Sequence, residues 1–181
     1  MKNKGFTLVE MIVAVGLFAI VMTVATGAIF SIVDANRSAQ SLNSAITNFS
    51  FAAESMVRDI RTGNRYVCGG TLPIQNPLDC AADGNTDIAF YDANNNPVQY
   101  YLDQTAHQIM KWENNAPAPI AITAPEVTIE SMLFYVSGTD IVSHQHQPKV
   151  LLIIKGYAGV GKNKSSFNIQ TLISQRLLNT Q

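Results

Sequence analysis

Charged side chains are scarce in this chain. Asp, Glu, Lys and Arg make up 14% of its 181 residues, and the formal net charge is −1. A protein that binds nucleic acid through its phosphates needs a positively charged surface, which this composition does not provide. Long runs of like charge, which are typical of interaction tails, are also missing. We therefore expect no direct nucleic-acid binding.

Recognisable catalytic patterns are missing as well. The sequence shows no Ser, His and Asp arrangement and no paired carboxylates that would indicate acid–base chemistry. The segment GYAGVGKN (156–163) approaches a nucleotide-binding loop, but Asn163 stands where that motif needs Ser or Thr. An alternating β pattern follows it instead of a helix that could receive phosphate. We expect a structural protein with no enzyme activity and no cofactor.

Only two cysteines are present, Cys68 and Cys80. Residues 66–86 around them are rich in glycine and proline, which predicts a loop. An even number of cysteines fits a disulfide outside the cytoplasm, and it fits two free thiols equally well in a cytosol. The compartment has to be inferred from the N-terminus.

Residues 6–33 are apolar or small except for one ionisable side chain, Glu10. A helix of that length runs to about 42 Å, more than the ~30 Å of hydrocarbon in a bilayer. Lys2 and Lys4 precede it, and positive charge on a short flank keeps that flank in the cytoplasm. We expect a single-pass helix in the cytoplasmic membrane, with the rest of the chain outside. On that topology we predict a Cys68–Cys80 disulfide.

Glu10 is unfavourable in lipid, by roughly 2.5–3.5 kcal/mol at the centre of a span. Two interpretations are open. Glu10 can lie at the level of the headgroups, with the span beginning after it. Alternatively, it can pair with a positive group within the membrane, such as the α-amine of a neighbouring chain. That amine exists at Phe6 only if the chain is cut after Gly5.

The segment KGFTLVEMIVAVGLFAIV (4–21) resembles the prepilin signature of type IV pilins and pseudopilins. The matching positions are Lys4, Gly5, Phe6, Thr7, Leu8, Val9 and Glu10. The resemblance implies cleavage between Gly5 and Phe6 by a prepilin peptidase and N-methylation of Phe6. It also implies that Glu10 pairs with the Phe6 amine of the adjacent subunit during assembly. The implied partners are other pilin or pseudopilin subunits, the peptidase, an inner-membrane assembly platform and the lipid bilayer.

The rest of the chain divides by pattern. We expect a leader at 1–5, a transmembrane and assembly helix at 6–33, an amphipathic helix at 34–63 and a β-sheet domain at 64–181. Apolar residues recur along the amphipathic helix with spacings of three and four. They are Leu42, Ile46, Phe49, Ala53, Met56 and Ile60. This stripe predicts packing on the protein's own sheet, and a partner helix is the alternative. Thr62, Gly63 and Asn64 predict the helix end.

The β-sheet domain contains several short alternating segments. We expect a meander of strands at 88–91, 98–102 and 108–112, a strand at 127–136, and a hairpin formed by 149–158 and 165–177. The predicted fold class is α+β, with a long N-terminal helix packed on an antiparallel β-sheet, as in pilins. The segments ESMVRDIRTG, VQYYLD and FNIQTLISQR resemble minor pseudopilin J and minor pilin W in particular.

One weak metal candidate lies in the first turn of the meander. Asp92, Asn94 and Asn96 present oxygens at alternate positions, as in the first half of a calcium-binding EF-hand loop. The glycine and the distal glutamate of that loop are missing, and an Asn-rich turn is the competing interpretation.

Taken together, these patterns predict a minor pilin or pseudopilin. It would be a structural subunit of a type IV pilus or a type II secretion pseudopilus, in the tip or priming complex, and periplasmic or extracellular once assembled. A single-pass anchored binding or sensor domain that never polymerises is an alternative. A major filament subunit is a third hypothesis.

Overall fold

The computed structural model describes residues 5–70, 72–80, 82–113, 116–139, 147–159 and 164–176. Lys2 and Lys4 of the predicted leader, residues 160–163 of the glycine-rich loop and residue 177 of the predicted last strand lie outside the described residues. The chain divides into two compact units, Met1–Gln40 and Ser41–Gln181.

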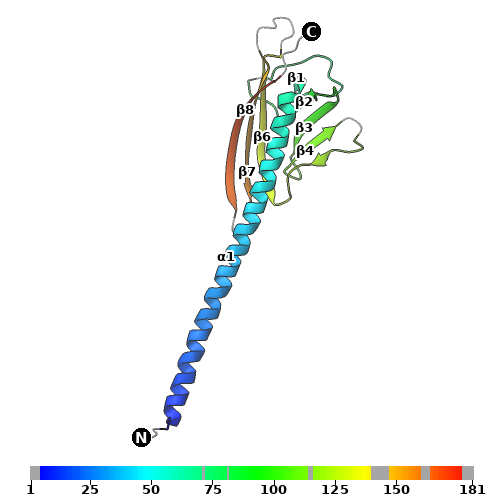
Figure 1. The fold of residues 1–181 in the computed structure, drawn as a ribbon. Helices are drawn as coiled ribbons and strands as arrows, with labels where there is room; N and C mark the ends of the chain where they lie inside the picture. The colour runs from blue at the N-terminus through cyan, green and yellow to red at the C-terminus, as the bar shows by residue number, and fades with distance from the viewer. Residues whose placement is uncertain are drawn as a thin grey trace. The chain divides into compact units, whose positions relative to one another are not determined.

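One helix, α1 (Leu8–Thr62), contributes residues to both units (Figure 1). The sequence predicted a continuous helix, and this is confirmed: the helix has 55 residues and passes through Gly27. In the first unit two threonine hydroxyls in the middle of the apolar segment bond to the helix backbone. Thr23 Oγ1 donates to Ala19 O at 2.8 Å, and Thr26 Oγ1 donates to Met22 O at 2.7 Å. These internal bonds satisfy hydroxyl donors in a segment that is otherwise suited to lipid.

In the second unit, α1 buries one face against the protein's own sheets. The fully buried helix residues are Ala45, Phe49, Ala52, Met56 and Ile60. The prediction of an own-core stripe is therefore confirmed, but its centre is shifted. Ile46, which the spacing placed on the stripe, keeps 42% of its surface exposed, and Ala45 and Ala52 are buried instead. Small alanine side chains at the interface let the helix approach the sheets closely.

The β structure forms two antiparallel sheets instead of the single sheet that the sequence predicted. The first has the order β1-β2-β3-β4-β5: β1 (Asn64–Cys68), β2 (Asp87–Tyr91), β3 (Pro97–Asp103), β4 (Gln108–Glu113) and β5 (Ile120–Ala121). The second has the order β6-β7-β8: β6 (Val127–Ser137), β7 (Lys149–Ala158) and β8 (Ser165–Ser174). The predicted loop at 66–86 was wrong at its start, because Tyr66–Cys68 belong to β1.

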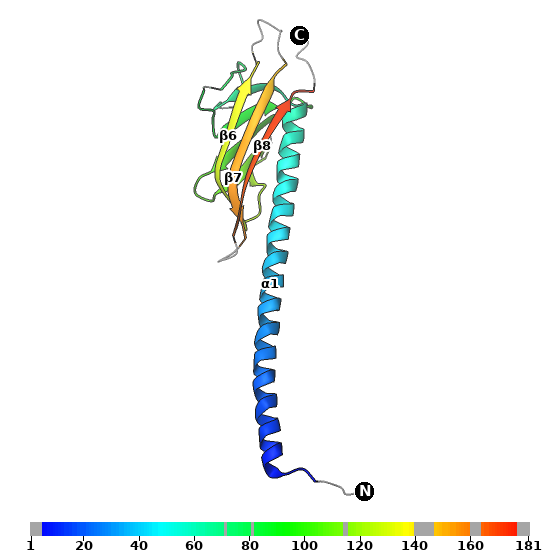
Figure 2. The same cartoon turned by 90° about the vertical axis from the view of Figure 1, so that its left-hand side faces the viewer.

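The core lies between the two sheets and the buried face of α1 (Figure 2). Strand alternation is clear in β3, where Val98, Tyr100 and Leu102 point into the core. Aromatic contacts join distant segments: the Phe90 and Tyr100 rings are 6.1 Å apart, and Phe49 of α1 lies 4.5 Å from Phe167 of β8. The architecture is α+β and consistent with a pilin-like fold.

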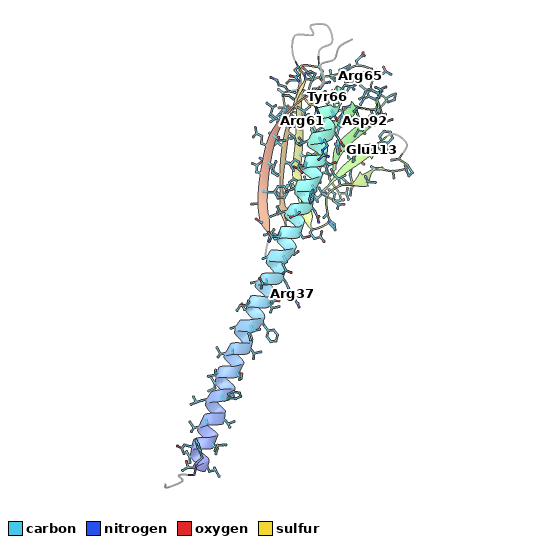
Figure 3. The ribbon with its side chains drawn as sticks, in the orientation of Figure 1. Arg37, Arg61, Arg65, Tyr66, Asp92 and Glu113 are labelled. Carbon is cyan, nitrogen blue, oxygen red and sulfur yellow. A yellow bond between two sulfur atoms is a disulfide. The ribbon has the colours of Figure 1, made fainter. Side chains whose placement is uncertain are left out.

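The end of α1 lies where Thr62, Gly63 and Asn64 predicted it. The Tyr66 hydroxyl lies within hydrogen-bond distance of two carbonyl oxygens at this turn, 2.6 Å from Ile60 O and 2.7 Å from Gly63 O. Ile60 O also accepts from Gly63 N at 3.3 Å. Burial raises the pKa of Tyr66, which keeps this hydroxyl protonated. Arg61, Arg65 and Tyr66 surround this turn (Figure 3).

A polar contact fixes α1 to the first sheet. Asp59 Oδ2 accepts hydrogen bonds from the Tyr100 hydroxyl at 2.7 Å and from Lys111 Nζ at 2.8 Å. Lys111 also pairs with Glu113. Burial, together with the bond to Asp59, raises the pKa of Tyr100. Burial acts to lower the pKa of Lys111, but its bonds to Asp59 and Glu113 raise it overall.

The edge of β6 that faces away from β7 is paired by segments outside the sheet. Asn85 and Phe134 exchange two backbone hydrogen bonds of 2.9 and 2.7 Å, and Cys80 N donates to Val136 O at 3.0 Å. Ile129 N donates to His107 O at 2.9 Å. These backbone groups of the edge are thus paired within the chain, which protects this part of it from pairing with other chains.

Candidate functional site

The predicted cleavage junction precedes the first turn of α1. Gly5 and Phe6 are exposed and lie outside the helix, which begins at Leu8. Phe6 keeps 78% of its surface exposed. A side chain added at Gly5 would meet no other heavy atom within 4 Å. An exposed peptide bond outside regular structure is accessible to a peptidase.

Thr7 and Glu10 form a capping box at the start of α1. Thr7 N donates to Glu10 Oε2 at 3.2 Å, Thr7 Oγ1 donates to the same oxygen at 3.1 Å, and Glu10 N donates to Thr7 Oγ1 at 3.3 Å. The Thr and Glu side chains thus satisfy donors that the first turn leaves unpaired. The carboxylate also lies near the positive end of the helix dipole.

This local role of Glu10 was missed by the sequence interpretation, which weighed only headgroup contact and a partner amine. The signal was visible, because Thr-x-x-Glu directly before an apolar run is a sequence signature of a helix start. The three described bonds use the backbone N–H of Glu10 and one carboxylate oxygen, Oε2. Capping and pairing with a cation are therefore compatible roles for the same side chain.

The part of α1 that follows presents apolar side chains around its whole circumference. It is long and apolar enough to cross a membrane, with a mean hydropathy of 2.5 over its most apolar window and none of that window buried. Phe18, Val21 and Phe30 illustrate this, each with at least 60% of its surface exposed. A surface of this kind needs lipid or neighbouring helices around it.

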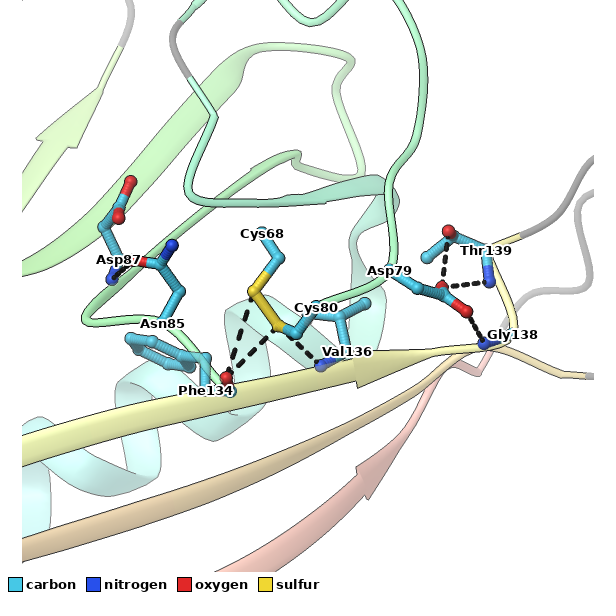
Figure 4. The surroundings of a disulfide bond; sticks show 9 residues. All are labelled: Cys68, Asp79, Cys80, Asn85, Asp87, Phe134, Val136, Gly138 and Thr139. Carbon is cyan, nitrogen blue, oxygen red and sulfur yellow. Dashed lines mark hydrogen bonds between the residues drawn. A yellow bond between two sulfur atoms is a disulfide. The ribbon is translucent and has the colours of Figure 1, made fainter. Parts of the chain in front are cut away.

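Cys68 and Cys80 form a disulfide, with their Cα atoms 5.0 Å apart (Figure 4). The bridge lies against β6: Val136 N donates to Cys80 Sγ at 2.9 Å, and this sulfur lies 3.2 Å from Phe134 O. It therefore fixes the segment after β1 to the edge of the second sheet.

Asp79 anchors the same segment to the end of β6. Its carboxylate accepts hydrogen bonds from Thr139 N at 2.9 Å, from Thr139 Oγ1 at 2.6 Å and from Gly138 N at 3.1 Å (Figure 4). Burial acts to raise the pKa of Asp79, but these hydrogen bonds lower it overall. Nothing in the local sequence indicated this contact, because it joins residues about sixty positions apart.

The residues of the calcium candidate form hydrogen bonds with one another within a turn. Asp92 Oδ1 accepts from Asn94 N at 2.8 Å and from Asn96 N at 2.7 Å, and Asn96 Nδ2 donates to Asp92 Oδ2 at 3.3 Å. The Asn96 side chain thus directs its nitrogen, not its oxygen, toward Asp92, which Figure 3 labels at the sheet surface. Among the described residues, no group of three or more His, Cys, Asp or Glu side chains could hold a metal ion. The geometry fits an Asn-rich turn.

Comparison with known proteins gives one match. Residues 1–26 match the family model described as the prokaryotic N-terminal methylation motif. Curated proteins and solved structures give no significant match. The matched segment contains the Gly5–Phe6 junction and the Thr7–Glu10 capping box. This motif, in a chain whose long helix packs on antiparallel sheets, supports a type IV pilin-like or pseudopilin-like protein.

Proposed function

We propose that the chain is a minor pilin or pseudopilin, a structural subunit in the tip or priming complex of a type IV pilus or type II secretion pseudopilus. The observation that carries the proposal is the methylation motif at residues 1–26 ahead of a helix that is apolar all round. The minor type is favoured by the segments ESMVRDIRTG, VQYYLD and FNIQTLISQR, which resemble minor pseudopilin J and minor pilin W.

Processing is the first step of the proposal. A prepilin peptidase cuts between Gly5 and Phe6 and methylates the new Phe6 amine. The exposure of both residues and their position before the helix support this step. The second unit then lies outside the cytoplasmic membrane, in the periplasm or outside the cell. The Cys68–Cys80 disulfide fits that oxidising environment.

Assembly is the second step. Glu10 pairs with the Phe6 amine of the adjacent subunit, within the membrane and at an inner-membrane assembly platform. An opposite charge offsets the cost of a carboxylate in lipid. The capping box supports this step, because it holds the Glu10 side chain in place at the start of the helix before a neighbour arrives.

The deciding experiment is the mass and N-terminal sequence of the protein purified from cells with and without prepilin peptidase. With the peptidase, we expect a chain that begins at N-methyl-Phe6. Without it, we expect the leader to be intact. A leader that stays intact in cells with the peptidase would overturn the proposal and favour a single-pass binding or sensor domain.

A second measurement separates a minor from a major subunit. In sheared filaments we expect the chain at a small fraction of the amount of the main subunit. Stoichiometric abundance along the filament would instead assign it as the major subunit, and the tip or priming role would be wrong.

A further inference from the structure

A groove lies on the face of the first sheet that points away from the core. Its volume is about 530 Å³, within the usual range of ligand sites. The cross-strand register pairs Asp87 with Tyr101 and Gln99 with Trp112, so these side chains lie in neighbouring rows on one face of β2, β3 and β4. They line the groove together with Leu72 and Pro119.

The rest of this outer face is covered by the chain itself. Val67, Ile74 and Ala89 form a second, small hydrophobic cluster, with Leu72 and Tyr91 packed against it. The segment after β1 therefore covers the β1 and β2 side of the sheet. The groove begins beside this cover, where Leu72 leaves the β3 and β4 side chains accessible.

The groove has a negative charge without a matching cation. Asp87 supplies its carboxylate, and among the described residues no Lys or Arg lines it. The described ion pairs do not include Asp87. Among the described residues, the side-chain group that bonds it is the amide of Gln99, whose Nε2 donates to Asp87 Oδ2 at 3.3 Å. Burial raises the pKa of Asp87, and the bond from Gln99 only partly offsets this.

The aromatic rings of the groove also lack a cation. Elsewhere the chain places a cation over the rings of three tyrosines, at 5.2 Å for Arg65 over Tyr91 and at 4.2 Å for Lys164 over Tyr157. The third is Lys111 over Tyr100 at 5.6 Å. Tyr101 and Trp112 have no such partner among the described residues. Tryptophan is the ring that attracts cations most strongly.

We infer that this groove binds a lysine or arginine side chain of a partner polypeptide, with its cation between the Asp87 carboxylate and the rings of Tyr101 and Trp112. A neutral ligand such as a sugar can stack on the rings and donate hydroxyl hydrogen bonds to the carboxylate, but it brings no positive charge to balance Asp87. The groove is larger than one side chain, so it also accommodates the residues that flank the cation. This binding role goes beyond filament assembly and does not depend on it.

The test uses the full chain in micelles of an uncharged polyoxyethylene detergent. Trp112 is the one tryptophan of the chain, so its emission reports directly on the groove. The probe is the peptide acetyl-Gly-Arg-Gly-amide, with the citrulline peptide as a neutral control of the same shape. We expect a saturable change in emission with the arginine peptide and none with the citrulline peptide. Equal binding of the two peptides, no saturation with either, or saturable binding of maltose in their place would overturn the inference.

Three variants locate the site. Asp87→Asn keeps the shape and removes the charge, so we expect binding at least about tenfold weaker, the size of a lost hydrogen bond to a charged group. Glu54→Gln removes an exposed carboxylate on α1 and should bind like the parent. Gln99→Lys places a cation beside Asp87 and should abolish binding, which keeps the test decisive if Asp87→Asn does not fold. Parent-like affinity in folded Asp87→Asn or Gln99→Lys would overturn the inference.

Variants of Trp112 lose the fluorescent reporter, so their affinity for the arginine peptide is measured by titration calorimetry. Trp112→Phe keeps an aromatic face and should retain most of the affinity. Trp112→Leu removes it and should bind several-fold more weakly. Equal affinity of the phenylalanine and leucine variants would remove the aromatic part of the proposed site. Circular dichroism before each titration confirms that the variants are folded.

Discussion

The helix α1 presents two different surfaces in the two units of the chain. In Met1–Gln40 its apolar side chains are exposed all round, whereas in Ser41–Gln181 they form one stripe buried against the protein's own sheets. The difference lies in what covers the apolar side chains: lipid or other subunits in the first unit, and β strands of the same chain in the second. The same substitution should therefore have different consequences in the two units.

The largest difference should appear when a phenylalanine is removed. Phe49→Ala empties a site that is 2% exposed and in contact with Phe167, so it should lower the free energy of unfolding of the second unit by about 3–5 kcal/mol. The matched change Phe30→Ala, at a position 67% exposed, should leave that free energy unchanged. Urea unfolding followed by Trp112 emission measures both. A large loss with Phe30→Ala would contradict the division into two units.

Removal of the disulfide should come next. The double change Cys68→Ser and Cys80→Ser opens a closed loop with a sequence separation of 12, which the loop-entropy treatment values at roughly 3 kcal/mol. The loss should be confined to the free energy of unfolding of the second unit. The amount of protein in the membrane fraction should not change. Alkylation of protein taken directly from the envelope gives an independent check. Two reactive thiols there would contradict both the bridge and the proposed topology.

A smaller and pH-dependent effect is expected at Asp79. Its pKa is lowered in the folded state, so it contributes stability that is present above the pKa of the unfolded chain and lost as the pH falls through the folded value. Asp79→Asn should lower stability at pH 7 by about 1 kcal/mol, the usual net value of such bonds. In this variant the free energy of unfolding should also fall less steeply below pH 4 than it does in the parent. Asp83→Asn, at an exposed carboxylate nearby, should keep the stability and pH profile of the parent.

The smallest effect on folding, and the largest on assembly, is expected at Glu10. Glu10→Gln keeps a side chain that suits a capping box but removes the charge, Glu10→Val removes both, and Thr7→Ala removes the cap but keeps the charge. All three should leave unfolding of the second unit unchanged. If the charge is needed, the two Glu10 variants should be depleted from sheared filaments and Thr7→Ala retained.

The outcome for Glu10→Gln separates the two roles. Retention of Glu10→Gln together with loss of Thr7→Ala would show that the carboxylate matters only as a helix cap. Crosslinking to neighbouring subunits in the membrane provides a second readout. It is needed because a subunit at the tip has a neighbour on one side only.

Periodicity in the sequence was enough to predict α1 and most strands, and Thr62, Gly63 and Asn64 predicted the end of the helix. It did not predict correctly the features that depend on contacts between distant segments, namely the start of β1 and the exact buried face of α1. Tyr66–Cys68 belong to β1 because β2 pairs with this strand, although two glycines follow directly. The stripe on α1 is centred on Ala45 and Ala52, since small residues allow the sheets to come close.

The functional and structural sites also fall into those that local sequence indicates and those that depend on distant residues. The capping box of Thr7 and Glu10 was present in the local sequence and was overlooked. The contacts of Asp59 with Tyr100 and Lys111 join positions 41 and 52 residues apart, so no local pattern could have indicated them. The groove beside Asp87 depends on the register of three strands and on a cover from the segment after β1. Neither can be derived from spacing along the chain.

The contact between Phe49 and Phe167 has a consequence for the order of events during synthesis. Phe49 lies on the first element of the chain and Phe167 on its last strand, β8. The ribosome completes α1 long before β8 exists, so Phe49 lacks this contact until β8 has been made, although Asp59 can already bind Tyr100 and Lys111 of the first sheet. Such distant contacts slow folding and leave apolar surface uncovered meanwhile. The second unit therefore completes its core only once β8 has joined it, and a chain that stops within β8 should be cleared by proteases instead of accumulating.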